Sequence, residues 1–271
     1  YAVEPIVVSQ SLAIAGLAVA TSTAFYGQLE GMAIPLVFFP AFITFALSVS
    51  LVPAISEAAA QNNRRLVEHR LQQTIRLCLI LGAPCVVLIW VLAEPLSILL
   101  YHQKAVARLM QIMAPFAILF YLQGPLSSIL QGLDEAKVAM RNSIVGAIIK
   151  TSLIFALGSR PEFGIDGVVM GINCGIVIVT TLHFLSIIKR VPFTIEIKQI
   201  IKLIISIFLV MSFSQHMYFY FETSLFLRIV YTALTCVGSY ILCLCFFSLL
   251  RKDDVRRIPY LGKWMSYILP N

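Results

Sequence analysis

The chain has 271 residues, of which 59% are hydrophobic and only 12% are charged. Soluble domains carry about 45–50% apolar and about 25% charged residues, so this composition excludes a water-soluble protein. The mean hydropathy of +0.91 points the same way. Because backbone polar groups in lipid are satisfied most simply within helices, the sequence predicts an all-α integral membrane protein.

The net charge of +7 does not indicate nucleic-acid binding, because no basic run with interleaved aromatic residues occurs. The six cysteines lie in apolar stretches without CxxC spacing, which favours buried free thiols over disulfides or a metal site. The four histidines lie in separate segments, and no glycine-rich phosphate-binding motif is present. We therefore expect neither an enzyme nor a protein that depends on a metal or another cofactor.

Segments long enough to cross a membrane, about 20 mostly apolar residues each, recur along the chain. Residues 1–15 predict the end of a truncated helix, and the Ala-, Ser-, Thr- and Gly-rich residues 16–31 predict a loop. Complete spanning helices are predicted at about 32–56, 77–100, 109–133, 142–158, 166–188, 202–221 and 228–250. The first residue is Tyr1 and no signal-peptide pattern follows, so we expect the chain to begin partway through a longer protein.

The basic residues between these helices alternate strongly in number, and Lys and Arg favour cytoplasmic loops. One side of the membrane would hold Arg64, Arg65, Arg70, Arg76, Lys137, Arg141, Lys189, Arg190, Lys198, Lys202, Arg251, Lys252, Arg256, Arg257 and Lys263. The other side would hold only Lys104, Arg108, Arg160 and Arg228. The bias predicts that loops 59–76, 131–141 and 189–202 and the basic tail 251–271 are cytoplasmic. The tail could also lie on an anionic leaflet.

Lys150 lies near the middle of the helix predicted at 142–158. A central Lys costs roughly 2.5–3.5 kcal/mol on insertion scales, so such a residue usually faces a cavity or a partner. No Asp or Glu falls near the middle of a predicted span, so a structural ion pair would need an acid from outside this chain. We expect Lys150 to face a cavity and meet an anionic substrate, with packing or snorkelling as the alternative.

Further polar and small residues fall on single helix faces. Gln123, Ser127 and Gln131 are spaced at i, i+4 and i+8, which suits either the wall of a hydrated path or hydrogen bonds between helices. The glycines near residues 164–175 favour close helix packing. Prolines inside the first three complete spans predict kinks, which are common in transporters but also occur in channels and receptors.

Three segments carry a family resemblance: GMAIPLVFFPAFITFALSVSLVPAISEAAA (31–60), ILFYLQGPLSSILQGL (118–133), and RNSIVGAIIK (141–150) followed by GIDGVVMGI (164–172). They resemble the stage V sporulation protein B family, within the multidrug/oligosaccharidyl-lipid/polysaccharide exporter superfamily. The long ungapped pattern in 31–60 is the most specific. The resemblance covers essentially the whole chain and matches the C-terminal half of such proteins.

The resemblance implies a fourteen-helix flippase, of which residues 1–188 would form the C-terminal lobe and 189–250 two additional helices. It further implies alternating access and a lipid substrate carrying an undecaprenyl-linked saccharide, a peptidoglycan precursor for the spore cortex, in the plasma membrane. The implied partners are membrane lipids and the N-terminal lobe. Lys150 would hold the pyrophosphate, and Arg141 and Arg76 would attract it earlier, unless they anchor the interface. Export of organic cations and a non-transporting scaffold in the spore envelope stay open.

Overall fold

The computed structural model describes residues 3–193 and 196–249, and their regular structure is helical. Short helical pieces open the chain, and long helices follow. The bounds are α1 Glu4–Ile14, α2 Val19–Gln28, the π-helical turn η1 Leu29–Ala33, α3 Ile34–Phe38, α4 Ala41–Ala60, α5 Arg64–Val91, α6 Ala93–Tyr101, α7 Val106–Gly132, α8 Ala136–Gly158, α9 Gly164–Ile188, α10 Ile197–Tyr220 and α11 Leu225–Phe246.

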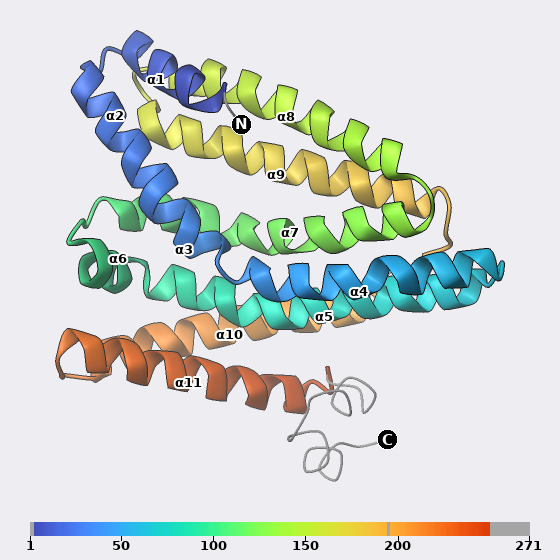
Figure 1. Ribbon diagram of the computed structural model, residues 1–271. Coiled ribbons are helices and arrows are strands. Elements are labelled where there is room, and N and C mark those ends of the chain that lie inside the picture. Colours follow the sequence, from blue (N-terminus) through green and yellow to red (C-terminus); the bar gives the residue numbers. More distant parts are fainter. Residues whose placement is uncertain (1–2, 194–195, 250–271) are drawn as a thin grey trace.

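The long helices run side by side as a bundle with α7 at its centre (Figure 1). Helix α7 contacts α9 on one side and the α4–α5 pair on the other. Helix α8 packs along α9, and α1 lies on α8. The hairpin of α10 and α11 packs against α5, on the side away from α8 and α9. The chain therefore places its first helix next to a helix more than one hundred residues later.

Seven helices within the described residues are long and apolar enough to cross a membrane: α4, α5, α7, α8, α9, α10 and α11. This confirms the predicted fold class and the number of spans. The boundaries differ, because α5 begins at Arg64 and α8 begins at Ala136. Most of the residues in the loops predicted at 59–76 and 131–141 are therefore helical, and their basic residues lie within α5 and α8. The span predicted at 77–100 is divided at Leu92 into α5 and α6. The predicted tail 251–271 lies outside the described residues.

The prediction of a loop at 16–31 was wrong. Residues 19–38 form a continuous helical rod of α2, η1 and α3. The small polar residues that suggested a loop bond to their own helix: the hydroxyl of Ser22 donates to the carbonyl of Ala18, and that of Thr23 to the carbonyl of Val19. Ser and Thr hydroxyls that bond to the carbonyl four residues earlier are compatible with a helix, and most of α2 is exposed, with only Ser22 buried.

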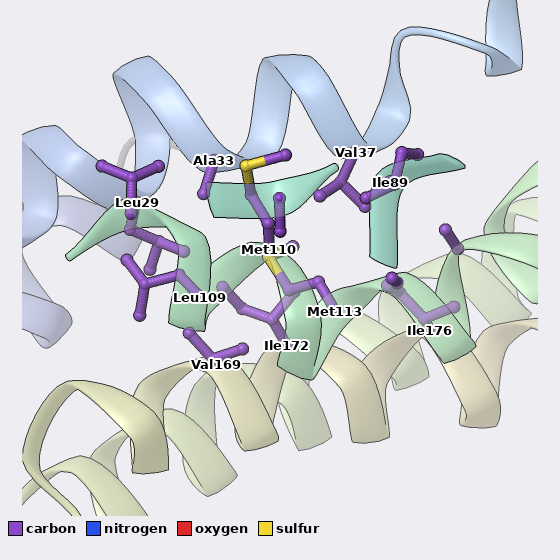
Figure 2. Close-up of a cluster of buried hydrophobic side chains, with 14 of the residues drawn as sticks. Leu29, Ala33, Val37, Ile89, Leu109, Met110, Met113, Val169, Ile172 and Ile176 are labelled. Carbon is purple, nitrogen blue, oxygen red and sulfur yellow. The ribbon is translucent and has the colours of Figure 1, made fainter. Parts of the chain in front are cut away.

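The rod is held by the main hydrophobic core (Figure 2). Its residues Leu29, Ala33 and Val37 are at most 1% exposed and face α7. The side chains of Met110 and Met113 on α7 fill the space between this rod and α9, and both are fully buried. Unbranched methionine adapts to the irregular gap where helices meet at different angles. The core thus packs η1 and α3 against the centre of the bundle, whereas Ser22 is the only buried residue of α2.

Two tyrosines supply hydrogen bonds where proline or a helix break leaves backbone carbonyls without partners. Pro84 lies inside α5 and has no N–H for the carbonyl of Ile80, four residues earlier. The hydroxyl of Tyr240 on α11 donates to that carbonyl at 2.8 Å. The hydroxyl of Tyr121 on α7 donates at 2.7 Å to the carbonyl of Val37, in the last turn of α3. Each tyrosine therefore links its own helix to a backbone carbonyl of another helix that has no donor within that helix.

We expect Tyr240→Phe to destabilise the attachment of α11 to α5. The substitution leaves the buried Ile80 carbonyl without its donor, which costs about 1–3 kcal/mol. The measurement is thermal unfolding of the purified protein in detergent. Tyr231→Phe on the same helix is the control, since the Tyr231 side chain is 40% exposed. Equal melting temperatures for the two variants would contradict the role of Tyr240.

Candidate functional site

Lys150 forms an ion pair inside the bundle. Its Nζ lies 2.7 Å from Oε2 of Glu4, and the two side chains are 22% and 15% exposed. Lys150 is on α8, and Glu4 is the first residue of α1, where the helix dipole favours a carboxylate. The expectation that an acid partner must come from outside the chain was wrong. The sequence hid the partner because Glu4 precedes Lys150 by 146 residues.

The aliphatic part of Lys150 is clamped between α8 and α9. A Cβ added at Gly175 of α9 would lie 2.7 Å from Cβ and 2.8 Å from Cγ of Lys150. Gly167 and Gly171 approach Leu157 and Ile154 of α8 just as closely. The prediction that the glycines near 164–175 serve helix packing is confirmed for Gly167, Gly171 and Gly175, but not for Gly164, which has nothing within 4 Å of an added Cβ. The close approach fixes the direction of the Lys150 side chain, so its ammonium points to α1.

A second carboxylate lies near this pair. Glu30 belongs to η1, its residue is exposed, and it interacts electrostatically with both Glu4 and Lys150. Tyr26, one turn earlier on α2, interacts with Glu30 and Glu4. Three helical elements thus contribute to a cluster of one ammonium and two carboxylates, which we call the charge triad: Glu4, Glu30 and Lys150.

The predicted stripe on α7 does not join the triad. The amide Nε2 of Gln123 donates to the carbonyl of Ile176 and the hydroxyl of Thr180, both on α9. Gln131 donates to Ser127 at 3.2 Å within α7 itself. Of the two readings left open, hydrogen bonding between helices fits Gln123. Ser127 is half-buried and Gln131 is exposed, so these two remain accessible to a polar ligand.

The two arginines predicted to assist Lys150 lie apart from it. Arg141 is exposed on α8, nine residues before Lys150, which places it roughly 13 Å away along the helix axis. Arg76 is half-buried on α5, and α7 lies between α5 and α9. Arg141 is therefore separated from Lys150 along the bundle, and Arg76 is separated from it across the bundle.

Sequence reasoning missed a polar cluster between α8 and α9. Asn142 is 4% exposed, and its amide donates to the carbonyl of Leu182 and to the hydroxyl of Ser186. It also contacts Nδ1 of His183, which is 2% exposed. A helical-face count would have found it, because Asn142, Gly146 and Lys150 recur every four residues on the side that meets α9. Asn142 thus sets the register in which Lys150 meets Gly175.

Comparison with known proteins identifies the class to which this bundle belongs. The MatE family matches residues 10–156, more than half of the chain. The chain belongs to the MatE family. This confirms the superfamily expected from the sequence, and the membrane-length helices make the chain a multi-pass membrane protein.

Among individual relatives, "Stage V sporulation protein B" of Bacillus subtilis (strain 168) is 42% identical over 96% of this chain and 51% of its own length. "Sporulation protein YkvU" of the same organism is 32% identical over 72% of this chain and 44% of its own length. "Lipid II flippase MurJ" of that organism is 30% identical over 57% of this chain and 29% of its own length. The chain thus spans about half the length of the curated relative that it matches over 96% of its residues, and less of the others.

A solved structure supports the fold. "Lipid II flippase MurJ, inward closed conformation" superimposes with a TM-score of 0.55 and 15% sequence identity. The match covers 83% of this chain and 48% of that structure. At this identity the likeness establishes the helical arrangement and no more.

We expect Gly175→Ala to separate α8 from α9 and to loosen the packing of the Lys150 side chain against α9. The new methyl group would overlap the Lys150 stem, and such overpacking costs about 1–3 kcal/mol. Gly238→Ala on α11 is the matched control, because nothing lies within 4 Å of its added Cβ. Thermal unfolding in detergent should show a loss for Gly175→Ala and no loss for the control. An unchanged melting temperature for Gly175→Ala would show that the interface between α8 and α9 can accommodate the added methyl group.

Proposed function

We propose that this chain is the C-terminal half of a flippase that moves an undecaprenyl-linked saccharide, a peptidoglycan precursor for the spore cortex, across the plasma membrane. Residues 1–188 are its C-terminal lobe, and the helices within 189–250 are two additions. The observation that carries the proposal is 42% identity to "Stage V sporulation protein B" along nearly the whole chain. The match to a lipid II flippase in both sequence and fold supports a lipid-linked substrate.

Alternating access explains why half of such a protein would be built as one firmly packed bundle. Two bundles must move about a shared site at the membrane midplane. Helices α4, α7, α8 and α9 pack around one core, so they would move as a body. The N-terminal lobe is then the partner that supplies the other wall of the site.

We propose that the substrate pyrophosphate is bound by Lys150 and attracted by Arg141 and Arg76. The proposed saccharide contacts are Gln123, Ser127 and Gln131. A charge-assisted bond from an ammonium to phosphate is stronger than a neutral one. In the structure the Glu4 carboxylate pairs with the Lys150 ammonium, so the pyrophosphate of the lipid would have to compete with Glu4 for Lys150. Gln123 would contribute as a wall residue already held by α9.

Export of organic cations is a second candidate, and one observation favours it. Intramembrane carboxylates usually attract cations, and the structure gathers Glu4 and Glu30 beside Lys150. The sequence had predicted no Asp or Glu near the middle of a span. A non-transporting scaffold would need neither a cation-attracting carboxylate nor a phosphate-binding lysine inside the membrane.

Reconstitution into liposomes distinguishes these functions. The protein expressed from its complete gene should translocate a fluorescent undecaprenyl-pyrophosphate saccharide, measured by loss of signal to an external quencher. The 271-residue chain alone should fail, because one lobe provides only one wall. Uptake of an organic cation without lipid translocation would establish an exporter instead. If the protein shows neither activity, the result would favour the non-transporting scaffold.

Lys150→Gln and Glu4→Gln should change lipid binding in opposite directions. Removing the ammonium should weaken binding of undecaprenyl pyrophosphate by about ten- to a hundredfold, the worth of a hydrogen bond to a charged group. Removing the competing carboxylate should strengthen binding. The measurement is a binding titration of the purified complete protein in nanodiscs. Loss of binding in both variants would assign the pair a purely structural role.

We also propose that the C-terminus is cytoplasmic, from the cation bias between the two sides. Single cysteines should be labelled from outside the cell at position 104 or 160, next to α7 and α9. Cysteines at 64 or 198, in the first turns of α5 and α10, should be protected. The reverse pattern would invert the orientation.

A further inference from the structure

The charge triad has more carboxylates than its ammonium can neutralise. Lys150 pairs with Glu4 at 2.7 Å, while Glu30 forms no ion pair with any residue that the structure describes. Glu30 nevertheless interacts with both members of the pair. Two like charges that share one counter-ion repel each other, and each weakens the hold of the other on the cation. Glu30 is therefore an alternative carboxylate for Lys150 besides Glu4.

Glu30 lies in a segment built to change its geometry. Residues Leu29–Ala33 form a π-helical turn between α2 and α3, and such turns occur frequently at functional sites. A π turn holds one residue more than an α turn. Its conversion to α-helix would rotate the helix on one side by about 100°, the angle per residue of an α-helix. That rotation would move Glu30 relative to α8.

Lys150 itself is poorly suited to move. Its Cβ, Cγ and Cδ all lie within 3.1 Å of where a Cβ on Gly175 would be, so α9 holds the stem. Glu4, in contrast, begins a short helix of 11 residues, and Glu30 is exposed. The stem of Lys150 is therefore held by α9, and the two carboxylates are the more movable partners.

We propose that Lys150 exchanges its ion-pair partner between Glu4 and Glu30, and that the exchange is coupled to the π-helical turn at Leu29–Ala33. In one state Lys150 holds α1 against α8, as in the structure. In the other state it holds the α2–α3 rod, and α1 is released. The exchange gives the lobe a two-state element that biases the position of its first helices. It goes beyond the proposed function, because it does not depend on which substrate is carried.

Distance measurements between α2 and α8 test this exchange. Spin labels at Val19 and Ile148, which are 74% and 62% exposed, report rotation of α2 relative to α8. The protein is expressed from its complete gene, with its native cysteines replaced, and studied in nanodiscs by pulsed electron resonance. Glu30→Gln should enrich the distance found in this structure. Glu4→Gln should enrich a second distance, and we expect the ratio of the two populations to change by about tenfold.

Two controls make the outcome decisive. Adding Lys150→Gln should abolish the difference between Glu4→Gln and Glu30→Gln, because the shared cation is gone. Glu57→Gln, which removes an exposed acid on α4, should leave the distances unchanged. The proposal is wrong if Glu4→Gln and Glu30→Gln shift the distances in the same direction, or if neither shifts them. These readouts contain no transported lipid, so their failure would leave the flippase proposal standing.

Discussion

Inside a bilayer no water is available to a polar group, so each donor, acceptor and charge must find its partner within the protein. The helices of this chain are joined at the places where that demand arises. Tyr240 serves the carbonyl that Pro84 leaves unpaired, and Asn142 bonds to three groups of α9. The ion pair of Lys150 and Glu4 is the strongest case, because a charge is the most costly group to bury.

This pair connects the fold to the proposed activity. A lobe that rocks as a unit needs helices that stay together and a few that change partners. The tight glycine contacts make α8 and α9 a rigid pair, whereas α1 depends for its position on contacts with α8 that include one ion pair and the approach of Ser11 to Gly158. The neighbouring Glu30 offers the same ammonium a second partner. Rigid and exchangeable contacts thus lie side by side on one helix.

Hydropathy and charge spacing predicted the long helices well, since the membrane requires apolar segments of a set length. The glycine stripe was equally readable, because small residues at four-residue spacing have few other uses. Residues 16–31 were misread because Ser, Thr and Gly favour loops in water, and the sequence does not show that Leu29 and Val37 are buried against α7. The partner of Lys150 could not be predicted because pairing between α1 and α8 is a property of the folded bundle. The same holds for the hydrogen bonds of Gln123 to α9.

A double-mutant cycle on Glu4 and Lys150 tests whether their half-buried ion pair holds α1 to the bundle. The stability of the purified protein would be measured by thermal unfolding for Glu4→Gln, Lys150→Gln and the combined variant. Lys150→Gln leaves the half-buried Glu4 carboxylate without its cation, and Glu4→Gln deprives Lys150 of its ion-pair partner, so each should destabilise more than the combination does. A combined loss equal to the sum of the single losses would show that the two side chains act independently and that the ion pair does not hold α1.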